Sequence, residues 1–167
     1  MFRIHFLDVG QGDCIILQFE NGRIYLIDSN EVAEKITPIE YLTSVLRVTQ
    51  IETIVVTHPH DDHISGLNQI IEQIPVRQVW LTDYPYKSYA YRRFLSVLAH
   101  NPEIHVIFPR SGTSVSEGKD LFQILAPPPN LLRGTHSDVN NASLVLKVTI
   151  AHLEQRASTS GADAEFG

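Results

Sequence analysis

Residues 51–66 of the chain read IETIVVTHPHDDHISG. The β-branched run over 51–57 is typical of a short strand that is buried on both faces. Three histidines and two aspartates follow between His58 and His63, and an apolar helical pattern continues to Ile74. Side chains that follow a buried strand leave the carboxyl edge of a sheet, where α/β proteins commonly build their sites. The segment therefore predicts a strand, a site loop and a helix, in that order.

The loop carries the donor groups of a metal site. Imidazole nitrogens and carboxylate oxygens are ligands that zinc prefers, and a short loop can fold several of them onto one or two ions. Pro59 stiffens the loop, while Asp61 is expected to face water. The alternative, a solvated loop that is merely rich in histidine, is disfavoured by the buried strand directly before it. We expect one or two Zn²⁺ ions, with Mn²⁺ as an alternative, bound by His58, His60, Asp62 and His63.

Strand and helix patterns extend on both sides of this loop. The turn Asn21-Gly22 indicates a hairpin, because both positions tolerate positive φ. Thr37 and Glu40 have the spacing of a capping box at a helix start. Strands mixed with helices of this length indicate a layered α/β protein. Beyond 51–57, strands are expected over 2–9, 14–19, 23–27, 76–81, 104–108, 121–125 and 143–150, and further helices over 37–46 and 89–99.

Composition limits the class of protein. A chain of 167 residues with 43% hydrophobic and 19% charged residues has the length and apolar content of one domain. The net charge of −6 gives no support to a nucleic-acid binder unless a bound cation reverses the local field. The single cysteine, Cys14, excludes an intrachain disulfide. Neither a membrane span nor a signal segment is recognisable, so a cytoplasmic location is expected.

The loop also resembles a known signature. His58, His60, Asp62 and His63 form the His-x-His-x-Asp-His pattern of the metallo-β-lactamase superfamily. The resemblance implies an α/β (α+β) fold, the αββα sandwich, of which this chain has the N-terminal half and the start of the C-terminal half. It also implies that the two first histidines bind one metal, that the aspartate and the last histidine bind a second, and that Asp28 supports the site. The usual glycine after that aspartate is Asn30 here.

A narrower resemblance rests on three segments. Residues 6–13, 57–66 and 138–146 are together similar to the hydrolase domain of ComEC-type DNA-uptake (competence) proteins. It implies a phosphodiesterase or nuclease, with nucleic acid or another phosphodiester as the substrate. Asp62 is expected to be catalytic as well as a ligand. Supporting positions are expected at Asp8, Asp13, Asp28, Asp138, Asn140 and Asn141.

The chain departs from the superfamily pattern in its last third. Many members have a histidine just before the strand at 143, where this chain has aspartate and asparagines, and His136 has the wrong spacing. The bridging aspartate and late histidine of the family are not recognisable after Ile150, and His152 and Asp163 lie in a segment without strand pattern. We therefore expect an incomplete domain over 1–150 and a disordered or non-native tail over 151–167.

Three functions follow from these observations. The first is a metal-dependent phosphodiesterase or nuclease that uses a metal-activated water. The second is a truncated, non-catalytic metal-binding domain, and the third is hydrolysis of another ester, amide or thioester.

A separate segment combines four tyrosines with cations, and it is either a substrate-contacting face or the exposed side of a helix. Its residues are Tyr84, Tyr86, Lys87, Tyr89, Tyr91, Arg92 and Arg93.

Overall fold

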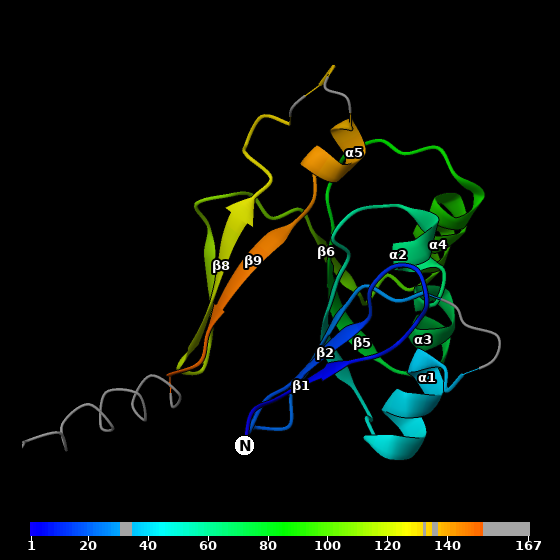
Figure 1. Cartoon of the computed structure of the whole chain (residues 1–167), viewed down its shortest axis with the longest axis vertical. Coiled ribbons are helices and arrows are strands. Elements are labelled where there is room, and N and C mark those ends of the chain that lie inside the picture. The colour runs from blue at the N-terminus through cyan, green and yellow to red at the C-terminus, as the bar shows by residue number, and fades with distance from the viewer. Residues whose placement is uncertain (31–34, 132, 135–136, 152–167) are drawn as a thin grey trace, which may run out of the picture.

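The computed structural model of the chain describes residues 1–30, 35–131, 133–134 and 137–151. Two sheets form its framework (Figure 1). The larger sheet has six strands in sequential order: β1 (Arg3–Phe6), β2 (Ile15–Gln18), β3 (Ile24–Ile27), β4 (Ile51–Val55), β5 (Val76–Trp80) and β6 (His105–Ile107). The smaller sheet has three strands: β7 (Ser114–Glu117), β8 (Asp120–Ala126) and β9 (Val145–Thr149).

Strand direction determines where the polar loops meet. β1, β2 and β3 are antiparallel neighbours, whereas β3, β4, β5 and β6 run parallel to one another. The carboxyl ends of β3, β4 and β5 therefore lie along one edge of the sheet. The residues after β3 and after β4, which include Asp28 and His58, are brought together at this edge.

Helices cover one face of the larger sheet. They are α1 (Pro38–Glu40), the π-helix η1 (Tyr41–Val45), α2 (Asp61–Ile64), α3 (Leu67–Gln73) and α4 (Tyr89–His100); α5 (Asp138–Asn141) lies apart, beside β9 (Figure 1). The predicted capping box is confirmed, because Thr37 Oγ1 accepts from the Glu40 amide while the Glu40 carboxylate accepts from the Thr37 amide. Apolar residues of α3 and α4 such as Leu67 and Phe94 join the core against this face.

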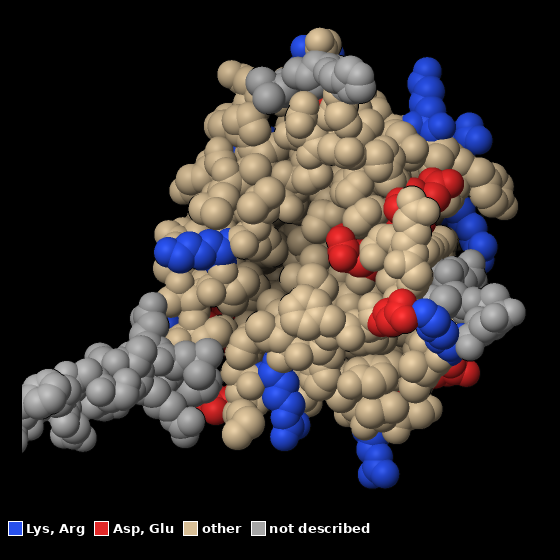
Figure 2. Space-filling model, in the orientation of Figure 1, with Lys and Arg blue, Asp and Glu red and all other residues tan. Residues whose placement is uncertain are grey.

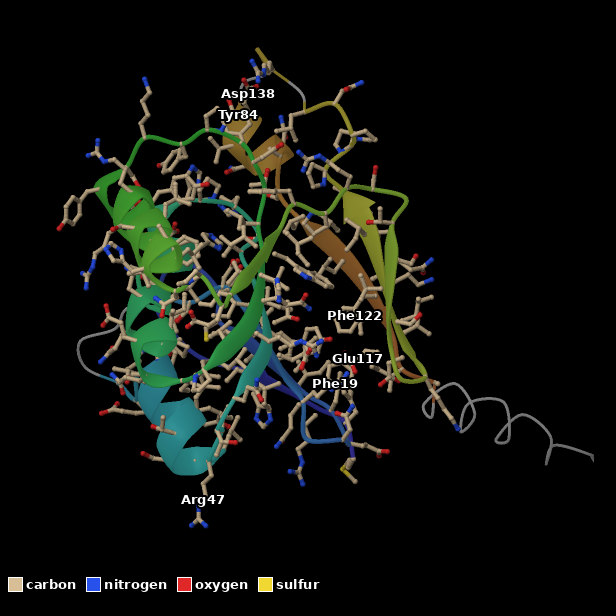
Figure 3. All side chains as sticks on the ribbon, turned by 180° about the vertical axis from the view of Figure 1, so that it is seen from behind. Phe19, Arg47, Tyr84, Glu117, Phe122 and Asp138 are labelled. Atoms are coloured by element: carbon tan, nitrogen blue, oxygen red, sulfur yellow. The ribbon has the colours of Figure 1, made fainter. Side chains whose placement is uncertain are left out.

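The opposite face of the larger sheet packs against the smaller sheet. Phe19 and Tyr25 meet Phe122 of β8 there, and the Tyr25 and Phe122 rings stack with centroids 4.6 Å apart. Figure 3 shows Phe19 and Phe122 in this space between the two sheets. Helices, large sheet and small sheet thus lie in successive layers, and the predicted α/β sandwich is confirmed.

Several elements differ from the expectations. The first strand ends at Phe6 rather than residue 9, because residues 7–13 turn away as a loop toward α2. β7 and α5 were not predicted, since a polar four-residue strand and a one-turn helix have little periodicity to detect. Residues 152–167 and His136 lie outside the described residues, so the expectations for them stay predictions. Within the described part, no helix has the length and apolarity to cross a membrane.

Candidate metal centre

The loops after β3 and β4 are tied together by backbone hydrogen bonds. The Asp28 amide donates to the Val55 carbonyl at 2.9 Å, and the Ser29 amide donates to the His63 carbonyl at 2.9 Å. Leu144, just before β9, donates its amide to the Thr57 carbonyl at 2.8 Å. Two chain segments, one after β3 and one before β9, therefore fix the backbone of the metal loop, which we define as residues 57–63.

Within the metal loop, the three histidine rings lie close to one another, and Asp62 lies beside His63. The ring of His58 lies 4.0 Å from that of His63 and 4.7 Å from that of His60, measured between centroids. Nε2 of His63 is 3.9 Å from a carboxylate oxygen of Asp62. The backbone contributes to this arrangement, because His60 is the extended N-cap of α2 and Asp62 and His63 lie in the turn that follows it.

Asp28 positions the metal loop through hydrogen bonds to Thr57 and His63. Its carboxylate is fully buried and accepts hydrogen bonds from the Thr57 amide at 2.7 Å, the Thr57 hydroxyl at 2.5 Å and Nδ1 of His63 at 2.8 Å. A carboxylate on one ring nitrogen fixes the tautomer and the ring orientation, which leaves Nε2 of His63 available as a metal ligand. Asp28 itself adopts a left-handed φ of 53°, which an aspartate tolerates better than most residues.

The two histidines next to this network differ in their affinity for a proton. Burial, together with the neighbouring His63 and His60, lowers the pKa of His58 to about 4. Burial also acts to lower the pKa of His63, but the hydrogen bond to Asp28 and its charge outweigh burial and raise that pKa. His58 is thus held as a neutral imidazole, the form that binds a metal.

Residues 8–13, which we call the GQG loop, pack directly against the metal loop. A Cβ at Gly12 would lie 2.0 Å from the carbonyl oxygen of Asp62, and Gly12 has a φ of +85°. Only glycine fits both conditions. The next residue, Asp13, offers a carboxylate oxygen within 4.8 Å of the ligand atoms of Asp28 and His63. Since Asp28 already accepts three hydrogen bonds, Asp13 is the member of this group with a carboxylate available to an ion.

Asn30 occupies the position where the superfamily usually has glycine. Its amide group donates to the Gln11 carbonyl at 2.8 Å, and its oxygen accepts from the Ser65 hydroxyl at 2.6 Å. Asn30 thereby connects the GQG loop to the end of α2. The sequence motif pointed to the GQG loop, but the roles of Gly12 and Asn30 depend on contacts across the fold and were not predicted.

The remaining expected residues lie at the margin of the site. Asp8 is 74% exposed, and it pairs with Lys35 and accepts from the Gly10 amide. Asp138 of α5 accepts from the Tyr84 hydroxyl at 3.3 Å and the Gly134 amide at 2.8 Å, and Figure 3 shows Tyr84 and Asp138 side by side. Asn140 and Asn141 belong to the same short helix. Of the two acidic residues in the GQG loop, it is therefore Asp13 that approaches the ligands.

This donor set fits a divalent cation. Three imidazole rings lie close together in the metal loop with the Asp62 carboxylate beside His63, a second carboxylate approaches from the GQG loop, and a buried carboxylate orients His63. Nitrogen and oxygen donors in this combination suit zinc, manganese and iron. The alternative of a merely solvated loop does not account for the buried Asp28 carboxylate, which is hydrogen-bonded to Thr57 and His63.

Comparison with known proteins identifies the family. The family model of the metallo-beta-lactamase superfamily matches residues 7–139, so the chain belongs to this superfamily. Its members bind divalent metals, and the converged side chains lie within the matched segment. No curated protein matches the sequence of the chain.

Solved structures share the fold at low sequence identity. The peroxy diiron species of the chemotaxis sensor ODP superposes with a TM-score of 0.55 and 17% identity, over 87% of this chain and 54% of that protein. A metallo-beta-lactamase from Staphylococcus aureus has a TM-score of 0.53 and 16% identity, over 92% of this chain and 39% of that protein. The metallo-beta-lactamase fold protein YhfI from Bacillus subtilis has a TM-score of 0.50 and 11% identity, over 83% of this chain and 50% of that protein. The chain thus spans about half or less of these proteins' length.

Proposed function

We propose that the chain is a metal-dependent hydrolase domain whose substrate is a phosphodiester and whose cofactor is zinc. The observation that carries the proposal is the convergence of His58, His60, Asp62 and His63 at the carboxyl ends of two parallel strands. The similarity of residues 6–13, 57–66 and 138–146 to ComEC-type hydrolases supports a phosphodiester over other esters and amides.

The chain's own residues divide the work of such a site. His58, His60, Asp62 and His63 would hold one or two ions, and Asp28 keeps His63 in the tautomer that can bind. A bound divalent cation would supply an activated water and positive charge for the phosphate oxygens. Asp13 lies close enough to act as a further ligand or as the acceptor of a proton from the attacking water.

A side-chain nucleophile is not needed and has no support among the described residues of the site. Cys14, the only thiol, is buried, and burial raises its pKa to about 12. At neutral pH it is a protonated thiol inside the core rather than a nucleophile. Attack by water is therefore the chemistry that this arrangement favours.

A second candidate is a metal-binding domain with little or no turnover. The observation in its favour is the α5 side of the site, where the Asp138 carboxylate is already bonded to Tyr84 and Gly134. Ligands would then come from the metal loop and the GQG loop alone. A pair of ions held from one side would be poorly fixed at the spacing of about 3.5–4 Å that in-line attack on phosphate requires.

Metal-dependent hydrolysis separates the two candidates. The purified chain would be loaded in turn with zinc, manganese and iron, and nitrophenol release from bis-nitrophenyl phosphate would be followed with the protein in excess. We expect slow release, below the roughly 1 per second of working enzymes, that requires metal and disappears in a His58→Ala/His60→Ala variant. Release that is equal in the variant would refute the hydrolase proposal, and metal binding without release would establish the second candidate.

A further inference from the structure

A hollow adjoins the candidate metal centre through Tyr86. It lies between α4 and the edge strand β6, has a volume of about 540 Å³, and we call it the α4 groove. Its lining is mainly apolar and aromatic, and includes Tyr86, Tyr91, Leu95, Leu98, Val106 and Phe108.

Tyr86 connects this groove to the metal loop. Its ring lies 5.2 Å from the ring of His60 and 6.3 Å from the ring of Tyr91, measured between centroids. Tyr91 is buried and forms the inner wall, whereas Tyr86 is only partly covered. The Tyr86 ring would thus lie between a ligand group in the groove and His60, a candidate metal ligand.

The groove exposes large apolar side chains that the described part of the chain leaves uncovered. Leu95 is 41% exposed and Phe108 is 49% exposed, although both lie beside well-buried neighbours such as Leu98. Large apolar side chains left open to water in a concave site mark a place where an apolar ligand group binds. β6 is the last strand of its sheet, so no further strand of the described chain covers them.

Charge around the groove indicates what that ligand group is attached to. Arg92 is exposed on α4 one turn before Leu95, and Lys87 is exposed just before the helix begins. Asp83, the acidic residue in the lining, is paired with Arg110 and is thereby neutralised. An apolar, aromatic wall with cations at its margin suits a flat ring that is joined to an anionic group.

The geometry points to the α4 groove as a subsite for the aromatic ring of a phosphoester, such as a nucleobase, whose phosphate lies at the metal loop. This inference rests on the proposed function, and it adds the substrate group that would determine specificity. Of the tyrosines singled out in the sequence, Tyr86 faces the ring, Tyr91 supports it from inside the core, and Tyr84 is bonded to Asp138 instead. The ring can belong to a free nucleotide or to a single strand of nucleic acid.

Binding of matched ligands tests the subsite without requiring turnover. Calorimetric titration of the zinc-loaded chain would compare thymidine 5′-monophosphate with 2-deoxyribose 5-phosphate, which lacks only the base. We expect the nucleotide to bind about tenfold more tightly, within the range for stacking of a base on an aromatic side chain. A short oligothymidylate as a third ligand identifies the source, because a gain over the mononucleotide indicates a strand and equal affinity indicates a free nucleotide.

Two variants with the same change in polarity make the test specific. Leu95→Gln/Phe108→Gln removes the apolar wall of the groove, and we expect it to abolish the preference for the nucleotide. Val115→Gln/Leu125→Gln changes two apolar residues of the small sheet that are 37% and 55% exposed, and it should keep the preference. Circular dichroism of both confirms the fold, and single Leu95→Gln replaces the double variant if that one does not fold.

The outcomes distinguish this inference from the proposed function. Equal affinity for the two small ligands, or binding of neither, overturns the subsite even if bis-nitrophenyl phosphate is hydrolysed. A preference that the groove variant retains overturns it as well. A groove-dependent preference without any hydrolysis supports the subsite and refutes the hydrolase proposal.

Discussion

The helix-covered face of the large sheet and the outer face of the small sheet differ in how completely the rest of the described chain covers them. Ile54 of the large sheet and Leu67 and Phe94 of the helices are fully buried in one continuous core. By contrast, Leu125 of the small sheet is 55% exposed, and α5 beside it has no buried residue. The metal loop belongs to the covered layer, where its backbone and His63 are fixed by buried partners. Asp28 is a buried polar partner of the metal loop, whereas Asp138 in the open layer bonds to Gly134, four residues away, and to the Tyr84 hydroxyl.

Among the described residues, the boundary between the two sheets is open on one side. An apolar groove of about 680 Å³ lies between the edge strands β1 and β9, lined by residues such as Ile4, Phe6 and Leu146. Figure 2 shows a hollow between the two sheets on this face of the molecule. Apolar surface of this kind on a free protein favours association. We call this hollow the open groove.

The largest effect is expected from removing ligands in the covered layer. His58→Ala/His60→Ala should reduce bound zinc or manganese to about a tenth of the wild-type content or less, because each change removes a ligand atom. Mass spectrometry of the metal after dialysis measures this. His100→Ala/His105→Ala, at two exposed histidines elsewhere, is the matched control. Equal metal content in the two double variants would show that the loop is not the site.

A smaller effect is expected from the buried partner of His63. Asp28→Asn keeps the shape of the side chain and its tolerance of the left-handed backbone, but it replaces the carboxylate that orients Nε2 of His63. Loss of such a partner typically lowers metal affinity by about 10–100-fold. Competition with a chromophoric chelator gives the affinity, and an unchanged value would mean that Asp28 serves only the backbone at Thr57.

Two glycine-to-alanine variants test the contact between the GQG loop and the metal loop. Gly12→Ala places a methyl group against the Asp62 carbonyl, whereas Gly10→Ala has a similar φ of +72° and nothing within 4 Å. The backbone penalty is common to both, so the difference in free energy of unfolding reports the contact. We expect Gly12→Ala to be less stable by about 1–3 kcal/mol, as for other overpacked sites.

Urea unfolding followed by circular dichroism measures both variants. Equal stabilities would mean that the GQG loop moves away from α2 at little cost. In that case the approach of Asp13 to His63 would not be fixed by the fold.

The open groove predicts weak self-association. Phe6→Ser should shift the chain toward monomer, because the Phe6 side chain is 75% exposed at the edge strand β1 and its burial contributes on the order of 1–2 kcal/mol. Sedimentation velocity at several concentrations measures the shift. Val115→Ser, at an exposed residue of β7 outside the groove, is the control. A distribution that Phe6→Ser leaves unchanged would indicate that the groove drives no association.

The smallest effect is expected in the open layer. Asp138→Asn should change metal affinity by less than about threefold, because Tyr84 and Gly134 both bond to the same carboxylate oxygen, Oδ2, and an amide oxygen in its place can still accept both bonds. The same chelator competition used for Asp28→Asn applies. A tenfold loss would contradict this and would place Asp138 among the ligands, which would also complete the α5 side of the site.

Local sequence determined much of this molecule. The β-branched run at 51–57 contains β4, the capping box at Thr37 begins α1, and the histidine rings of the metal loop lie close together. These features depend on side-chain periodicity, on hydrogen bonds within one turn and on the short reach of a loop, all of which neighbouring residues fix. The superfamily was recognisable for the same reason, since its signature lies within six consecutive residues.

Tertiary structure alone decided which distant residues lie beside the metal loop. The sequence offered Asp8 and Asp13 equally, and the packing of Gly12 against Asp62 brings Asp13 toward His63 while Asp8 pairs with Lys35. Likewise, nothing near Tyr86 in the chain indicates that its ring contacts His60. Such contacts join segments that are tens of residues apart, and they follow from strand order and layer packing rather than from any local pattern.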